Sequence, residues 1–203
     1  QAPLSLTIEG MSAEGGDGFE SVALINDTRA MAGTRDGRVV IWDLTTGETV
    51  HVFPAAALKT DPGHQADVYA IDISPDQTRA ITGAQDNTLI LWDIVNFTLI
   101  GTLEGHTDSV NAAHFNVNGT RVISGSSDDT LHLWDADPTS ATFGSVLRQF
   151  EGHDVNVRDV DFSPDWQSVV STSLDGTVRL WEVATGFELR RFTTGDGITQ
   201  RNR

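Results

Sequence analysis

The sequence predicts an all-β fold built from repeated four-stranded antiparallel units, and one constant spacing carries this prediction. Three times, the histidine of a Gly-His pair precedes a tryptophan by 28 residues. The three pairs are His64 and Trp92, His106 and Trp134, and His153 and Trp181. Together with Trp42, these tryptophans recur every 42 to 50 residues, a period that suits a unit of four short strands.

Within each unit, short segments rich in apolar and β-branched residues are separated by turn residues, which is typical of strands. No segment shows a helical period of useful length. We therefore expect one domain, residues 1–203, with units at 19–53, 64–103, 106–150 and 153–192. The expected strands cover residues 29–34 and 39–43, then 68–73, 79–84, 88–92 and 98–103, then 110–115, 121–126, 130–134 and 146–150, and finally 157–162, 168–173, 177–181 and 188–192.

These motifs resemble the WD-repeat (WD40) β-propeller family over almost the whole chain. Gly-His stands at 63–64, Trp-Asp at 92–93, Ser-Gly-Ser-Ser-Asp-Asp-Thr at 124–130 and Phe-Ser-Pro-Asp at 162–165. The resemblance implies a β-propeller of four-stranded antiparallel blades, four of which are present. In the first unit Gly10-Met11 stands where Gly-His is expected, so we expect that blade to lack its histidine.

Four blades leave a gap, because propellers of this family usually close with seven. Residues 4–8 resemble the fourth strand of a preceding blade, since Leu6-Thr7-Ile8-Glu9-Gly10 parallels Gly101-Thr102-Leu103-Glu104-Gly105. Residues 188–192 supply a fourth strand at the other end as well. We therefore expect a segment of a larger propeller of about seven blades. Two copies pairing into an eight-bladed ring are the alternative.

The resemblance also implies a structural role for the repeated polar residues. In the family, the Gly-His histidine, an aspartate before the third strand, a Ser or Thr of the second strand and the tryptophan form a buried hydrogen-bonded network. A histidine beside an aspartate suits acid–base catalysis, but three copies are better explained by buried polar groups that satisfy each other. The expected members are His64, Asp86 and Trp92, His106, Asp128 and Trp134, His153, Asp175 and Trp181, and Asp36 and Trp42.

The candidate binding residues follow from the same resemblance. In relatives, the residue five positions after the histidine lines the mouth of the central channel, and the residue before the turn aspartate surrounds the same face. Loops on a rigid scaffold are where binding groups concentrate. The first set is Tyr69, Asn111 and Arg158, with Glu20 at the corresponding place of the first unit, and the second is Arg35, Gln85, Ser127 and Leu174.

Three loop insertions bear on this face. Residues 11–18 and 53–62 precede first strands and are expected on the binding face, whereas 136–145 lies between third and fourth strands and is expected at the opposite face. They either extend the binding surface or are tolerated variation in loop length.

Composition limits the function further. The formal net charge of −16 and a pI near 4.4 oppose binding to a phosphate backbone, so nucleic acid is not an expected partner. No apolar run is long enough for a membrane helix, and the absence of cysteine excludes disulfides and thiolate metal sites. No nucleotide loop, nucleophile elbow or metal-spaced histidine pair occurs, and we expect neither metal nor cofactor.

We therefore expect a protein–protein interaction scaffold, not an enzyme, that binds a protein or peptide on the loop face around the channel. Two alternatives stay open. The blades could be an accessory or sensor domain of a longer signalling enzyme, such as a WD-repeat kinase, or a structural subunit of a large assembly. The remaining blades would come from the same longer chain or from a second copy.

Overall fold

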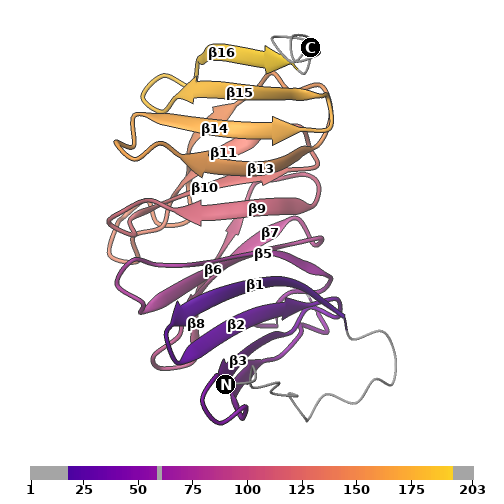
Figure 1. The fold of residues 1–203 in the computed structure, drawn as a ribbon, viewed down its shortest axis with the longest axis vertical. Coiled ribbons are helices and arrows are strands. Elements are labelled where there is room, and N and C mark those ends of the chain that lie inside the picture. The colour runs from indigo at the N-terminus through magenta and orange to yellow at the C-terminus, as the bar shows by residue number, and fades with distance from the viewer. Residues whose placement is uncertain (1–17, 59–60, 194–203) are drawn as a thin grey trace, which may run out of the picture.

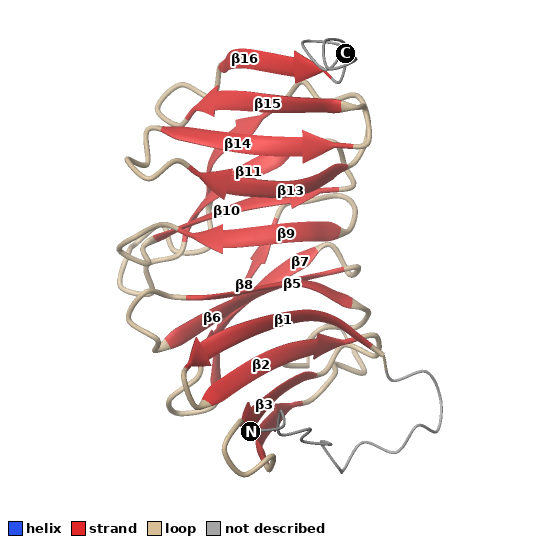
Figure 2. Cartoon of the chain, viewed as in Figure 1, coloured by secondary structure: helices blue, strands red, loops and turns tan. Residues whose placement is uncertain are grey.

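The computed structural model describes residues 18–58 and 61–193, which form four antiparallel sheets of four strands each. Within every sheet the strands pair in chain order, each with the next. The sheets follow one another along the longest axis of the molecule, from β1–β4 in indigo to β13–β16 in orange and yellow (Figure 1). Figure 2 shows strands joined by loops and turns throughout the described residues. The predicted all-β fold of four-stranded antiparallel sheets is confirmed.

We number the sheets blade 1 to blade 4. The expected strand at residues 4–8 and all but the last residue of the insertion at 11–18 lie outside the described residues. The strands are β1 (Phe19–Asn26), β2 (Arg29–Thr34), β3 (Val39–Asp43), β4 (Thr49–Phe53), β5 (Val68–Ile73), β6 (Arg79–Ala84), β7 (Thr88–Asp93), β8 (Thr98–Glu104), β9 (Val110–Phe115), β10 (Arg121–Ser126), β11 (Leu131–Asp135), β12 (Val146–Phe150), β13 (Val157–Phe162), β14 (Ser168–Ser173), β15 (Thr177–Glu182) and β16 (Glu188–Thr193).

The core consists of apolar layers between successive blades. Ile41 of blade 1 and Trp92 of blade 2 belong to the first layer, and equivalent clusters lie between blades 2 and 3 and between blades 3 and 4. Because blade 2 is covered on both faces, its third strand contains the continuous apolar run Leu89-Ile90-Leu91-Trp92. The first strands of neighbouring blades contact each other, and the fourth strands are the most exposed.

A glycine on the second strand lets each blade approach the next. A Cβ added at Gly125 of β10 would lie 2.6 Å from a methyl carbon of Val157 on β13, which is too close for real atoms. The same position holds Gly33 and Gly83, where the corresponding distances are 2.5 Å to Val68 and 2.7 Å to Val110. Each of the three seams between blades therefore pairs a glycine with a buried valine.

Blade 4 differs at this position, where Thr172 replaces the glycine. The face that blades 1 to 3 pack against the following blade is exposed here. Val170, Val178 and Phe192 are 37%, 36% and 43% exposed, whereas the equivalent side chains of the other blades are almost fully buried. Blade 4 thus presents an apolar sheet face without a glycine.

We expect Gly125→Ala to destabilise the chain by about 1 to 3 kcal/mol, because the new methyl group overpacks the seam against Val157. Thr172→Ala, at the equivalent exposed position, is the matched control and should change stability by no more than about 0.5 kcal/mol. Urea unfolding followed by tryptophan fluorescence measures both. Equal effects of the two substitutions would contradict the role of the glycine in the seam.

Candidate functional site

Three of the four blades contain the same chain of hydrogen bonds, which begins at the tryptophan. In blade 2, Trp92 Nε1 donates to Thr82 Oγ1 over 2.8 Å, and this hydroxyl lies 2.7 Å from His64 Nε2. His64 Nδ1 lies 3.0 Å from Asp86 Oδ2. Blades 3 and 4 repeat the arrangement with these sets: His106, Asp128, Ser124 and Trp134, and His153, Asp175, Ser171 and Trp181.

One set of protons satisfies every group of this network. The indole N–H donates to the hydroxyl oxygen, and every group is satisfied when the hydroxyl donates to Nε2 and Nδ1–H donates to the carboxylate. Burial alone would raise the pKa of Asp86, but its hydrogen bond and charge interaction with His64 outweigh burial and lower the pKa to about 2. The pKa values of Asp128 and Asp175 are lowered as well, because side-chain hydrogen bonds outweigh burial.

The network joins two loops at one end of the blade. Asp86 also accepts the backbone N–H of Gln65 over 2.9 Å and that of Thr88 over 3.0 Å, which ties the loop before β5 to the β6–β7 turn. The residue after the aspartate has a positive φ, 70° at Asn87, a conformation that Asn and Gly tolerate. We call the end of the blades that carries these two loops the loop face.

Blade 1 lacks this arrangement. Ala32 occupies the position of the hydroxyl residue, and the buried Trp42 Nε1 has no hydrogen-bond partner among the described residues. Asp36 instead bonds to Thr34 Oγ1 and to Arg38 Nε, the latter over 2.6 Å. Asp36 and Trp42 are both expected in the network, but the described residues do not link them, because Ala32 has no hydroxyl and the first unit has Met11 in place of the histidine.

The position two residues before each tryptophan holds a different side chain in every blade: Val40, Ile90, His132 and Arg179. In blade 3 the ring of His132 stacks on that of His106, with 4.0 Å between centroids. Neither ring nitrogen of His132 has a hydrogen-bond partner in the part of the chain that the structure describes. In blade 4 the buried Arg179 pairs with Asp175 and Glu188. Sequence reasoning missed this position, although the change of residue type along the repeats was visible.

The predicted channel-mouth residues come together at the loop face. Side chains from all four blades line a cavity of about 360 Å³, which we call the central cavity. Its lining residues are Glu20, Tyr69, Ser109, Asn111, Ser127 and Arg158. The sequence analysis named all of them except Ser109, which precedes β9 and has no fixed place in the repeat motif.

The central cavity offers groups of different chemistry. Asn111 Nδ2 donates to Ser127 Oγ over 3.0 Å and to the carbonyl of Val157 over 2.7 Å, so the amide is held between blades 3 and 4. Glu20 forms an ion pair with Arg35, which raises the pKa of Arg35. The Arg158 guanidinium makes no ion pair or hydrogen bond with another described residue and can meet an anionic or carbonyl group.

The four residues that precede the turn aspartates also lie at the loop face. Their backbone N–H groups donate to carbonyls just before the first strands of the same blades, over 2.8 to 3.1 Å. Gln85 and Leu174 are exposed but do not line the central cavity, whereas Ser127 does. The residues in this set are Arg35, Gln85, Ser127 and Leu174.

The loop insertions differ in position as the topology requires. The described part of the insertion at 53–62 precedes β5 at the loop face, where Ala56 N donates to the carbonyl of His64 over 2.8 Å. The insertion at 136–145 joins β11 to β12 at the opposite end, where Asp135 accepts hydrogen bonds from Ser140 and Thr142, both over 2.6 Å.

First strands behind the central cavity carry a further group of charges. His114 Nδ1 lies 3.8 Å from Asp72 and its Nε2 lies 3.9 Å from Asp159. Burial raises the pKa of Asp72, although its carboxylate accepts the backbone N–H of Phe115 over 2.7 Å. The channel wall below the cavity is therefore acidic, with one imidazole between two carboxylates.

The WD domain, G-beta repeat family (WD40) matches residues 56–93, 97–135 and 144–182, more than half of the chain. The chain belongs to this family. No curated protein matches this chain.

Solved WD40 structures support the fold. The chain is similar to "Structure of U3-55K" and to "Crystal structure of RRP9 WD40 repeats", each with 22% identity and a TM-score of 0.78. Both likenesses cover 92% of this chain, but only 54% and 53% of the other chains. The WD40 chain therefore spans about half the length of these two proteins, and the predicted propeller fold is confirmed.

Two absences apply to the described residues. Within residues 18–58 and 61–193, no group of three or more histidine, aspartate or glutamate side chains is placed to hold a metal ion. The same part of the chain contains no helix long and apolar enough to cross a membrane.

Ser124→Ala should destabilise the WD40 chain by about 2 kcal/mol or more, because it leaves two buried groups, the indole N–H of Trp134 and Nε2 of His106, without a partner. Ala32→Ser should have the opposite sign and stabilise by about 1 kcal/mol, because it gives Trp42 Nε1 an acceptor. Urea unfolding measures both variants. A destabilising Ala32→Ser would show that blade 1 is not limited by the missing hydroxyl.

Stability should fall as the pH is lowered from 7.5 to 5 because of His132. Burial, together with the neighbouring His106, lowers its pKa from 6.5 to about 4, so across this window the unfolded chain binds a proton that the folded chain does not. The linked loss is about 2 kcal/mol. His132→Ile, the residue of blade 2 at this position, should remove that part of the pH dependence in urea titrations. An identical pH profile for the variant and the original chain would exclude this explanation.

Proposed function

We propose that the WD40 chain is a non-enzymatic scaffold that binds a protein or peptide at the loop face, in the central cavity. The observation that carries this proposal is the convergence of side chains from all four blades on one cavity of about 360 Å³. Tyr69 offers an amphipathic ring, Asn111 an oriented amide, and Arg158 an unpaired cation. Tyr and Arg are the side chains that most often dominate interface energetics.

The charge distribution favours a protein partner over nucleic acid. Arg35 is already neutralised by Glu20, which leaves Arg158 as a single cation beside an acidic channel wall. A chain with a net charge of −16 repels a phosphate backbone. A peptide that offers a carboxylate or carbonyl to Arg158 and basic groups to the surrounding acids matches this surface.

The network geometry supports a non-catalytic role. The side chains of His64, His106 and His153 are fully buried, and each of their ring nitrogens has a partner within the blade. General acid–base catalysis requires contact between the substrate and the catalytic group. A substrate has no access to these buried imidazoles.

We further propose that these blades act within a larger propeller. The exposed apolar face of blade 4 and the coverage of about half of each similar structure support this arrangement. A ring of two copies is less compatible, because Thr172 of one copy would meet Phe19 of the other. The three seams within the chain pair glycine with valine at these positions, and a threonine opposite a phenylalanine would be overpacked.

Tyr69→Ala and Arg158→Glu should each weaken partner binding at least tenfold, because both side chains line the central cavity. Photo-crosslinkers are placed at Gln85 on the loop face and at Val95 at the opposite end. A partner that crosslinks at Gln85 but not at Val95 contacts the loop face and is chosen for the measurement. The dissociation constant of such a purified partner is then measured by calorimetry. The control is Val95→Ala, an exposed site in the β7–β8 turn, which should change nothing. Unchanged affinity in both cavity variants would refute the proposal.

A further inference from the structure

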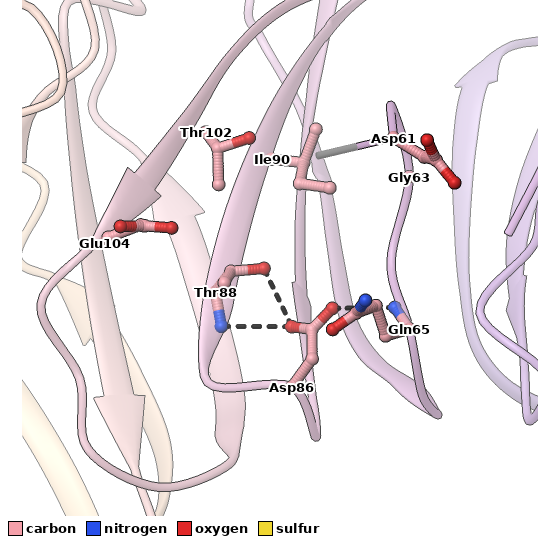
Figure 3. Close-up of a pocket in the computed structure, with 8 residues that line it drawn as sticks. All are labelled: Asp61, Gly63, Gln65, Asp86, Thr88, Ile90, Thr102 and Glu104. Carbon is pink, nitrogen blue, oxygen red and sulfur yellow. Dashed lines mark hydrogen bonds between the residues drawn. The ribbon is translucent and has the colours of Figure 1, made fainter. Parts of the chain in front are cut away.

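A second cavity lies at the loop face, away from the channel. It has a volume of about 130 Å³ and lies between β7, β8 and the loop before β5 (Figure 3). We call it the rim pocket. Its lining residues are Asp61, Gly63, Gln65, Asp86, Thr88, Ile90, Thr102 and Glu104. Neither the network nor the central cavity accounts for it.

Blade 4 shows what occupies the same place when a side chain fills it. The strand registers of the two blades make Asp175 equivalent to Asp86, Thr177 to Thr88, and Arg179 to Ile90. The guanidinium of Arg179 donates to Asp175 Oδ2 over 3.2 Å and to Thr177 Oγ1 over 3.2 Å. These two acceptors correspond to residues that line the rim pocket.

The glycine before the histidine locates the guanidinium more closely. A Cβ added at Gly152 of blade 4 would lie 2.7 Å from Nη1 of Arg179, so the guanidinium packs directly against this glycine. Gly152 is equivalent to Gly63, which lines the rim pocket. The guanidinium of blade 4 and the rim pocket of blade 2 therefore border equivalent residues, although at Gly63 the atom nearest to an added Cβ is the carbonyl oxygen of Pro54, at 2.2 Å.

In blade 2 the shorter Ile90 stands at the position of Arg179, and among the described residues the rim pocket lies beside it. The surroundings nevertheless suit a cation. Figure 3 shows the carboxylates of Glu104 and Asp61 on opposite sides of the pocket, with Asp86 and Thr88 between them. In blade 4 the guanidinium also donates to a third acceptor, the carboxylate of Glu188, 2.8 Å from Nη1. The equivalent residue of blade 2 is Leu99, so the additional carboxylates of the rim pocket come from other positions.

We propose that the rim pocket of blade 2 binds an arginine side chain of a protein or peptide partner. The guanidinium would bond to Asp86 and Thr88 as that of Arg179 bonds to Asp175 and Thr177, with its flat face against Ile90. Asp86 keeps its bonds to His64, because Asp175 accepts Arg179 while it also accepts His153. A planar guanidinium matches two acceptors at once, which the compact ammonium of lysine does not.

The test uses the whole chain and three short peptides, acetyl-Gly-Xaa-Gly-amide with arginine, citrulline or lysine as the central residue. Citrulline has nearly the same shape as arginine but no charge. Two-dimensional NMR follows the amide signals of Gly63, Gln65 and Thr88 during titration. We expect saturable shifts with the arginine peptide, and at least tenfold weaker binding of both the citrulline and the lysine peptide.

Two variants make the assignment specific. Ile90→Arg should fill the pocket from within, as Arg179 fills blade 4, and weaken peptide binding at least tenfold, whereas the matched control Ile90→Leu should bind within twofold of the original chain. If Ile90→Arg does not fold, the double variant Asp61→Asn with Glu104→Gln replaces it, with an expected weakening of at least fivefold. These carboxylates lie outside the His–Asp network.

The outcomes separate clearly. Equal binding of the citrulline or the lysine peptide, full affinity in Ile90→Arg, or full affinity in the folded double variant would each overturn the proposal. Arg158→Glu should leave peptide binding at the rim pocket unchanged, because Arg158 lines the other cavity. The rim pocket and the central cavity can therefore fail independently.

Discussion

The geometry of the loop face depends on one buried hydroxyl on the second strand of a blade. Thr82 accepts the indole N–H of Trp92 and faces Nε2 of His64, so a single oxygen joins the sheet to the loop before the first strand of the same blade. Asp86, which bonds to the other nitrogen of the imidazole, holds the β6–β7 turn by accepting the backbone N–H of Thr88. Because the central cavity and the rim pocket are both bordered by these loops, their shapes follow from a hydrogen bond that lies inside the blade.

The sequence predicts those features that depend on constant spacing. The network of blades 2 to 4 and the position of Tyr69, Asn111 and Arg158 were implied by the family resemblance. The constant separations within each repeat identified which residues take these places. Ser109 and the rim pocket were not predictable, because they depend on how loops of variable length pack beside the strands. The missing partner of Trp42 needed the alignment of Ala32 with the hydroxyl residues, a signal present in the sequence but overlooked.

One variable position shows how little of a blade's backbone determines its chemistry. A pocket lies beside Ile90, and Arg179 pairs with two carboxylates. His132 stacks on a neighbouring imidazole, and its two nitrogens have no hydrogen-bond partner among the described residues. In all three blades the second and third strands pair in the same register around this position. The repeat thus supplies a constant frame, and a single side chain decides whether a blade offers a recess, an internal ion pair or an acid-sensitive stack.

The pairing of glycine with valine at the seams also restricts the order in which blades can follow one another. A blade with glycine on its second strand accepts a neighbour whose first strand begins with valine, as blades 2, 3 and 4 do. Blade 4, with Thr172, could not be moved to an internal place in this array without a smaller residue at the start of the following blade. Repeats that look alike in sequence are therefore not freely exchangeable, and duplicating or shuffling them succeeds only where the two residues of each new seam are complementary.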